Sequence, residues 1–188
     1  MPKMKTRRVA TQAILLSLLI VSAFIKIPTS LIPFTLQLLV VLIISFITKP
    51  LDGMIIFVTY IIIGLVGIPV FASGGGLGYI YLPSFGFIIG FIIMHLVMSL
   101  MSRFLKRFKK VVGYLISSII GLITLYLVGI IYALFIFNVY QDLGYSIIKI
   151  LNLMVLPFIA FDLIKCLLAS IIVSRLDKII NIRGDYGI

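Results

Sequence analysis

Residues 64–91 read GLVGIPVFASGGGLGYIYLPSFGFIIGF, and this segment interrupts an otherwise continuous apolar run. Residues 53–102 contain no Asp, Glu, Lys or Arg over 50 positions. Because one membrane-spanning helix needs about 20 apolar residues, the run must hold two spans and a connection. Glycine and proline disfavour helix interiors, and their density places the connection at residues 67–84.

The connection at 67–84 is itself apolar and aromatic, and it contains the three successive glycines Gly74, Gly75 and Gly76. In a membrane protein, non-helical backbone at that depth is tolerated where protein buries it or where it lines a wet cavity. We therefore interpret the segment as a lid or inner wall of a binding cavity. A flexible extracellular linker is the alternative.

The composition indicates an integral membrane protein. Of 188 residues, 63% are hydrophobic and 11% are charged, against about 25% charged residues in a typical soluble domain. The formal net charge of +11 would suggest nucleic-acid binding in a soluble chain. Here the cations stand at the ends of apolar segments, so we expect no nucleic-acid partner. The single cysteine, Cys166, allows no internal disulfide.

The apolar pattern predicts an all-α fold with six transmembrane helices in one domain over residues 1–188. The expected helices cover about 8–25, 34–47, 53–66, 85–104, 111–137 and 146–174. The charged N-terminal start resembles a signal peptide, but no small-residue cleavage site follows, so we expect the first helix to be retained.

The distribution of Lys and Arg predicts that both termini are cytoplasmic and that loop 67–84 is extracellular. The inner side then holds 13 of the 16 basic residues, namely Lys3, Lys5, Arg7, Arg8, Lys49, Arg103, Lys106, Arg107, Lys109, Lys110, Arg175, Lys178 and Arg183. The outer side holds Lys26 and Lys149, and Lys165 falls inside the last helix.

Asp162 and Lys165 are the strongest candidates for a functional site. Ionisable groups at membrane depth are costly and usually face a cavity or each other. Their spacing of three residues puts both on one helix face, so they can bind a ligand or form a purely structural pair. Pro157, one turn earlier, can kink this helix and expose carbonyl groups to a cavity.

Other polar residues allow two interpretations each. Gln37, Tyr60 and Asn152 can bind a ligand or join helices by hydrogen bonds. His95 is the only histidine and has no soft or carboxylate ligands near it in sequence, so we expect interhelical packing or hydrogen bonding and no metal site.

Small residues mark one face of the first helix. Ala10, Ala13 and Ser17 follow spacings of three and four residues, which allow close helix contact with another protein or within the chain. The sequence lacks the G-x-x-x-x-G-K-[ST] pattern of a P-loop and the G-x-S-x-G pattern of a serine hydrolase, so we expect neither ATP binding nor an enzyme.

Three segments together resemble the BioY family, the biotin-specific S components of energy-coupling factor (ECF) transporters. They are the segment 64–91, IPFTLQ at 32–37 and PFIAFDLIK at 157–165. The resemblance implies an S-component fold, an outward-facing biotin pocket with Asp162 and Lys165 as polar anchor, and a prokaryotic cell membrane. It also implies a transmembrane coupling subunit and two ATPase subunits as partners. ATP would then be used by those partners, and this chain would bind no cofactor.

The resemblance extends to further residues. The family usually has Gly-Pro-Thr-Gly-Gly-Tyr where this chain has Leu82-Pro83-Ser84-Phe85-Gly86-Phe87, which keeps Pro83 and a hydroxyl at Ser84 as pocket candidates. The family's Ala-x-x-x-Ala contact with the coupling subunit has Ala13 and Ser17 as its nearest equivalent.

A pocket with aromatic walls and few polar groups suits biotin. We expect Asp162 to accept a ureido N–H, and Gln37 or the backbone amides of 74–76 to meet the carboxylate. An S component for another small vitamin, an intramembrane enzyme and a structural or channel-like protein are the competing functions.

Overall fold

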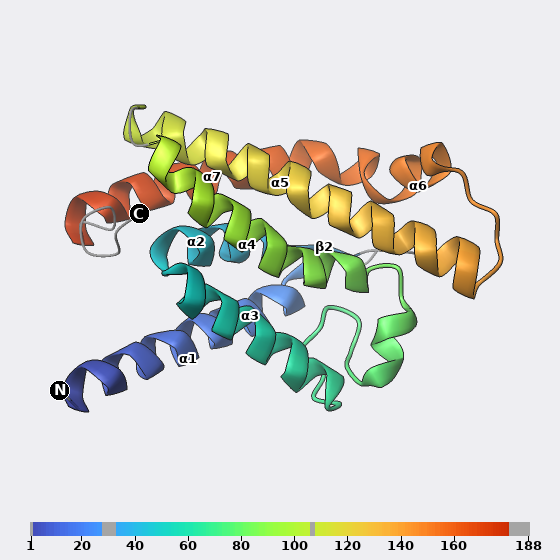
Figure 1. Ribbon diagram of the computed structural model, residues 1–188, viewed down its shortest axis with the longest axis horizontal. Coiled ribbons are helices and arrows are strands. Elements are labelled where there is room, and N and C mark those ends of the chain that lie inside the picture. Colours follow the sequence, from blue (N-terminus) through green and yellow to red (C-terminus); the bar gives the residue numbers. More distant parts are fainter. Residues whose placement is uncertain (1, 28–32, 106–107, 181–188) are drawn as a thin grey trace.

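The computed structural model describes residues 2–27, 33–105 and 108–180, which form a bundle of helices with one short hairpin (Figure 1). The elements in chain order are α1 (Pro2–Phe24), β1 (Lys26–Ile27), β2 (Phe34–Thr35), α2 (Gln37–Ile47), α3 (Pro50–Leu65), the 3-10 helix η1 (Leu77–Tyr81), α4 (Phe85–Leu105), α5 (Lys110–Phe135), the π-helical turn η2 (Ile136–Tyr140), α6 (Ile147–Met154) and α7 (Leu156–Ile180). The predicted all-helical class is confirmed.

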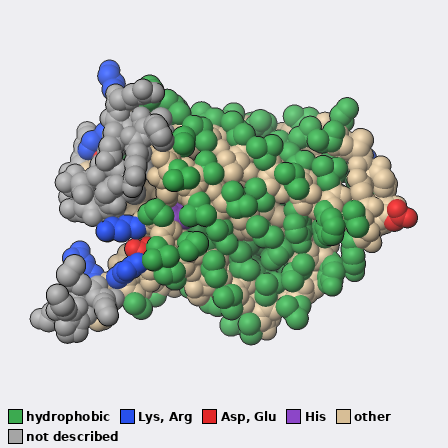
Figure 2. Space-filling view, in the orientation of Figure 1, with side chains coloured by type: hydrophobic (Ala, Val, Ile, Leu, Met, Phe, Trp, Pro, Cys, Tyr) green, Lys and Arg blue, Asp and Glu red, His purple; other side chains and the backbone are tan. Residues whose placement is uncertain are grey.

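Six of these helices are strongly apolar. Among the described residues, three are long and apolar enough to cross a membrane, at Thr6–Phe24, Lys110–Tyr140 and Leu156–Asp177. Three shorter apolar helices lie at Gln37–Ile47, Pro50–Leu65 and Phe85–Met101. Hydrophobic side chains cover most of the face seen in Figure 2, and Lys and Arg side chains gather at its left end. The start of α1 and the end of α7 lie toward that same end (Figure 1).

The expected continuous helix at 146–174 is wrong, because the chain forms two helices there. Helix α6 ends at Met154, Val155 leaves the helical conformation with φ −122° and ψ −56°, and α7 begins at Leu156. Pro157 lacks an N–H and therefore fits the first turn of a helix but not its interior. The proline signal was thus informative, and its effect is a break between two helices.

Residues 66–84 fold into an ordered cover over the ends of α3 and α4. The Phe71 ring is fully buried and packs against Tyr60, Tyr79 and Phe85. The Tyr132 hydroxyl of α5 donates to the Ile80 carbonyl within η1. These contacts contradict the alternative of a flexible linker, since the segment is fixed by buried aromatic packing and by a neighbouring helix.

Polar contacts join the helices at the end where the termini lie. Asp52, in the first turn of α3, accepts hydrogen bonds from Arg8 and from Gln12 of α1, the latter at 2.7 Å. Lys110 of α5 lies 2.7 Å from the fully buried carboxylate of Asp177 on α7. The basic residues Lys3, Lys5, Arg103, Lys106, Arg107, Lys178 and Arg183 lie outside the part whose side chains are described.

His95 makes the interhelical contact that the sequence suggested. Its ring is fully buried in α4, and Nε2 lies 2.9 Å from the Pro50 carbonyl of α3. Within the described ranges, no group of three or more His, Cys, Asp or Glu side chains could hold a metal ion.

Gly64 provides a test of the cover's packing. A Cβ atom at this position would overlap the Phe71 ring, whereas a Cβ at Gly78 would meet nothing within 4 Å. We expect Gly64→Ala to lower the free energy of unfolding by about 1–3 kcal/mol through overpacking. Thermal unfolding of the purified protein in detergent measures this change. Gly78→Ala is the matched control, and equal stability of the two variants would contradict the packing described here.

Candidate functional site

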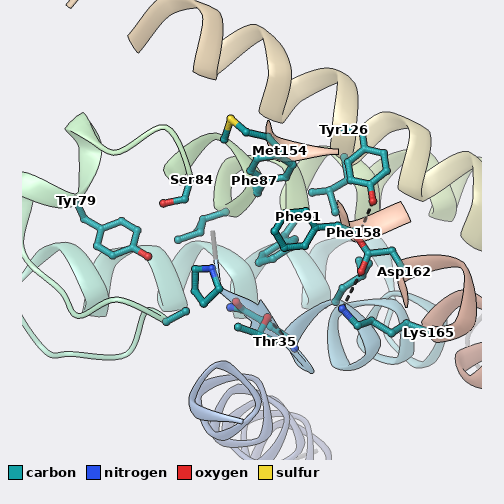
Figure 3. A pocket seen from close by; sticks show the side chains of 16 residues that line it. Thr35, Tyr79, Ser84, Phe87, Phe91, Tyr126, Met154, Phe158, Asp162 and Lys165 are labelled. Atoms are coloured by element: carbon teal, nitrogen blue, oxygen red, sulfur yellow. Dashed lines mark hydrogen bonds and ion pairs between the residues drawn. The ribbon is translucent and has the colours of Figure 1, made fainter. Parts of the chain in front are cut away.

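A cavity lies where the hairpin, the cover and helices α2, α4, α5, α6 and α7 meet (Figure 3). It encloses about 680 Å³ of space not filled by atoms, including the part open to solvent. The lining residues are Pro33, Thr35, Gln37, Leu38, Ala72, Tyr79, Ser84, Phe87, Ile88, Phe91, Leu125, Tyr126, Met154, Phe158, Asp162 and Lys165.

Asp162 and Lys165 form a polar cluster with Tyr126 on the wall of this cavity. Lys165 Nζ donates to Asp162 Oδ1 at 2.7 Å, and the Tyr126 hydroxyl donates to Asp162 Oδ2 at 2.7 Å (Figure 3). The side chains of Lys165 and Asp162 are only 12% and 9% exposed. Each carboxylate oxygen thus has one donor, and its remaining lone pairs can accept an N–H from a ligand.

Aromatic side chains form much of the remaining wall. Phe87 and Phe91 come from α4, and Phe158 from the first turn of α7. Phe158 stacks on Phe34 of the hairpin with ring centroids 4.2 Å apart. Tyr79 and Ser84 present hydroxyl groups on the side away from Asp162 in Figure 3. The cavity therefore offers a charged, hydrogen-bonding wall, flat apolar surfaces, and a second group of hydroxyls.

Gln37 lines the cavity and is held by residues behind it. Its Nε2 donates to the Tyr60 hydroxyl at 2.7 Å, and that hydroxyl donates to the Val70 carbonyl at 3.0 Å. Tyr60 itself is fully buried and is not part of the lining. The chain of bonds connects α2, α3 and the cover, so Tyr60 orients Gln37 and does not face the cavity.

The structure thus brings together Asp162, Lys165, Gln37 and Ser84 from the residues expected to bind a ligand. Pro83 is half-buried beside Ser84 but is not part of the lining. Asn152 lies on an exposed face of α6 and is also outside the lining.

Two of the three amides expected to meet an anion at Gly74, Gly75 and Gly76 bind within the chain instead. The Gly76 amide donates to the Gly64 carbonyl at 2.7 Å, and the Gly74 amide donates to the Phe71 carbonyl at 3.1 Å. A Cβ at Gly75 would overlap the Ile68 carbonyl. The glycines therefore allow tight folding of the cover onto α3, with φ of 124° at Gly74 and 100° at Gly76.

Sequence reasoning missed Tyr126. Tyr126 lies in an apolar helix with no charged residue near it in sequence, and only its position opposite Asp162 gives it a role. The available signal was the phenol itself, because a buried tyrosine hydroxyl usually has a hydrogen-bond partner.

The small residues of α1 face away from the rest of the protein. Ala10, Ala13 and Ser17 are all exposed, whereas Leu15 and Leu19 on the opposite face are buried. Internal packing was one of two interpretations of this face, and the structure contradicts it. The face is open to lipid or to another protein.

Comparisons with known proteins agree with one another. The family model described as "BioY family" matches residues 1–182. The probable biotin transporter BioY of Lysinibacillus sphaericus is 46% identical over 77 residues, which are 41% of this chain and 39% of that protein. The biotin transporter BioY of Thermotoga maritima is 35% identical over 88 residues, which are 44% of this chain and 52% of that protein. The matches thus span about half or less of these relatives.

A solved structure shares the fold. It is the crystal structure, at 2.1 Å, of the S-component for biotin from an ECF-type ABC transporter, with a TM-score of 0.80 and 23% sequence identity. The alignment covers 95% of this chain and 94% of that chain. The S-component fold therefore holds over nearly the whole molecule. Since the family model extends over residues 1–182, the chain belongs to the BioY family.

Proposed function

We propose that this chain is the biotin-binding subunit of an ECF-type vitamin uptake transporter. Three observations support the proposal: family membership, the names of the relatives, and the shared S-component fold. The observation that carries it is the cavity wall formed by Asp162, Lys165 and Tyr126. An S component for a different small vitamin is the alternative, because the aromatic walls would also suit other ring systems.

The chemistry of the cavity suits biotin. The ureido ring of biotin offers two N–H donors and one carbonyl acceptor in a plane, and the bicycle is otherwise apolar. Asp162 can accept a ureido N–H while Lys165, whose ammonium has further N–H donors beside the bond to Asp162, donates to the ureido oxygen. Phe87, Phe91 and Phe158 would cover the apolar faces of the bicycle and of the tail.

In the membrane, the six apolar helices would all span a prokaryotic cell membrane with both termini in the cytoplasm. The shorter helices α2 and α3 contain 11 and 16 residues, fewer than the roughly 20 of a full span. The hairpin and the cover would fill the part of the membrane thickness that α2 and α3 do not span, on the outer side. Biotin would enter from outside under the cover formed by residues 66–84.

Release of biotin toward the cytoplasm would depend on partner subunits. A transmembrane coupling subunit would bind the exposed face of α1, since small residues let two membrane helices approach closely. Two ATPase subunits would supply the energy. This chain would then act by binding and orienting its ligand, with no chemical step of its own.

Equilibrium binding of labelled biotin to the purified chain tests the proposed ligand. We expect Asp162→Asn to weaken binding about ten- to hundredfold, because hydrogen bonds to charged groups contribute about 1.5–3 kcal/mol. Asp142→Asn, at an exposed position outside the cavity, is the matched control. Unchanged biotin affinity in Asp162→Asn would refute the site, and tighter binding of another vitamin by the native chain would refute biotin.

Substitution on α1 tests the proposed partner surface separately from the ligand. Ala13→Phe adds a large ring to the small-residue face, so we expect normal biotin binding but loss of co-purification with the coupling subunit and the ATPases. Leu18→Phe is the control, since Leu18 is also exposed but lies about a quarter turn away from Ser17. Equal co-purification of native protein and Ala13→Phe would exclude this face as the contact.

A further inference from the structure

Lys26 lies beside the cavity although it is not part of its lining. It pairs with Thr35 in the antiparallel ribbon of β1 and β2. Directly opposite residues of such a pair place their side chains on the same face, about 4.5–5.5 Å apart at Cβ. Thr35 lines the cavity, and so does Ala72, whose carbonyl accepts a hydrogen bond from Lys26 Nζ. Lys26 thus pairs with one lining residue through the backbone and hydrogen-bonds to another through its ammonium group.

Lys165 is paired with a carboxylate, whereas Lys26 is paired with none among the described side chains. Three ion pairs join described side chains, namely Arg8–Asp52, Lys110–Asp177 and Lys165–Asp162, and Lys26 belongs to none of them. Its partner in the described part of the chain is a neutral carbonyl. An ammonium has three donors, so the bond to Ala72 leaves capacity for another acceptor.

This difference decides where an acidic group of a ligand can bind. A carboxylate placed at Lys165 would also face the like charge of Asp162, whereas Lys26 offers positive charge next to the lining residues Thr35 and Ala72. A carboxylate is moreover a stronger acceptor for an ammonium than a carbonyl is. Lys26 is exposed as a residue, so an incoming anion can reach it.

We propose that Lys26 binds the carboxylate of the ligand and makes the cavity selective for acids. The ligand would then lie with its neutral ureido ring at Asp162 and its acidic tail at Lys26, beneath Ala72 of the cover. This assignment rests on the proposed function, because it takes biotin as the ligand. The Lys26 ammonium would then contact both the ligand and the Ala72 carbonyl of the cover. Ligand binding would therefore affect the hydrogen bond that holds the cover to the hairpin.

Biotin and biotin amide separate this role from a purely structural one. The two molecules differ only in that the amide has a neutral carboxamide in place of the carboxylate. We expect the native protein to bind biotin at least tenfold more tightly than the amide. We expect Lys26→Met to reduce that ratio to near one and Lys26→Arg to retain most of it. Lys149→Met is the control, since that cation is stacked over the Tyr145 ring at 3.6 Å, outside the cavity lining.

Each outcome of this comparison is decisive. Equal affinity of the native protein for biotin and its amide overturns the assignment, whatever the variants do. If Lys26→Met weakens the binding of biotin and of biotin amide equally, the assignment is also overturned, because only the hydrogen bond between Lys26 and the cover is then lost. Failure of the native protein to bind either molecule refutes the proposed function instead, so the two failures are distinguishable.

Discussion

The Asp162 carboxylate, held between the Lys165 ammonium and the Tyr126 hydroxyl, is the constraint on which the site depends. Removing such charges from water costs several kcal/mol per ion, and their mutual attraction offsets this only with good geometry and further hydrogen bonds. Both carboxylate oxygens have donors at 2.7 Å, which meets that requirement. Because Tyr126 belongs to α5 and Asp162 to α7, the same contact aligns these two helices. The polar groups left facing the cavity are thus oriented by the fold before any ligand binds.

Two interruptions of the long helices shape the cavity beside this cluster. They are the break at Val155 and the cover at residues 66–84. The break at Val155 lets Met154 at the end of α6 and Phe158 at the start of α7 both line the cavity, although they belong to separate helices. The cover packs onto α3 because the Phe71 ring is buried in the space that Gly64 leaves open, and its residues Ala72 and Tyr79 line the cavity. A Pro at the start of α7 and a Gly near the end of α3 therefore shape the cavity without being part of its lining.

Sequence reasoning identified the charged residues whose place inside an apolar helix is energetically unfavourable, because that placement can be read directly from the sequence. A charged pair in an apolar helix needs an explanation, and Asp162 and Lys165 do line the cavity. The apolar pattern likewise gave the helical class and most of the helices. Tyr126 could not be assigned in this way, since its role depends on α5 lying against α7. The glycines at 74–76 were assigned to a ligand because their backbone freedom was visible, but their hydrogen-bond partners at Gly64 and Phe71 were not. Asn152 was expected to bind a ligand, but it is exposed on α6 and lies outside the lining.

Helix α1 connects the cavity with the face proposed for a partner. Its N-terminal part is held to α3 by Arg8, Gln12 and Asp52, and one side is buried through Leu15 and Leu19. Strand β1 begins only two residues after α1 ends at Phe24, and it carries Lys26. Helix α1 is thus followed almost directly by the hairpin, which contributes Thr35 to the cavity and contacts the cover at Ala72. The opposite face of α1 is exposed and contributes nothing to the cavity lining, so a partner bound there would leave the cavity itself free.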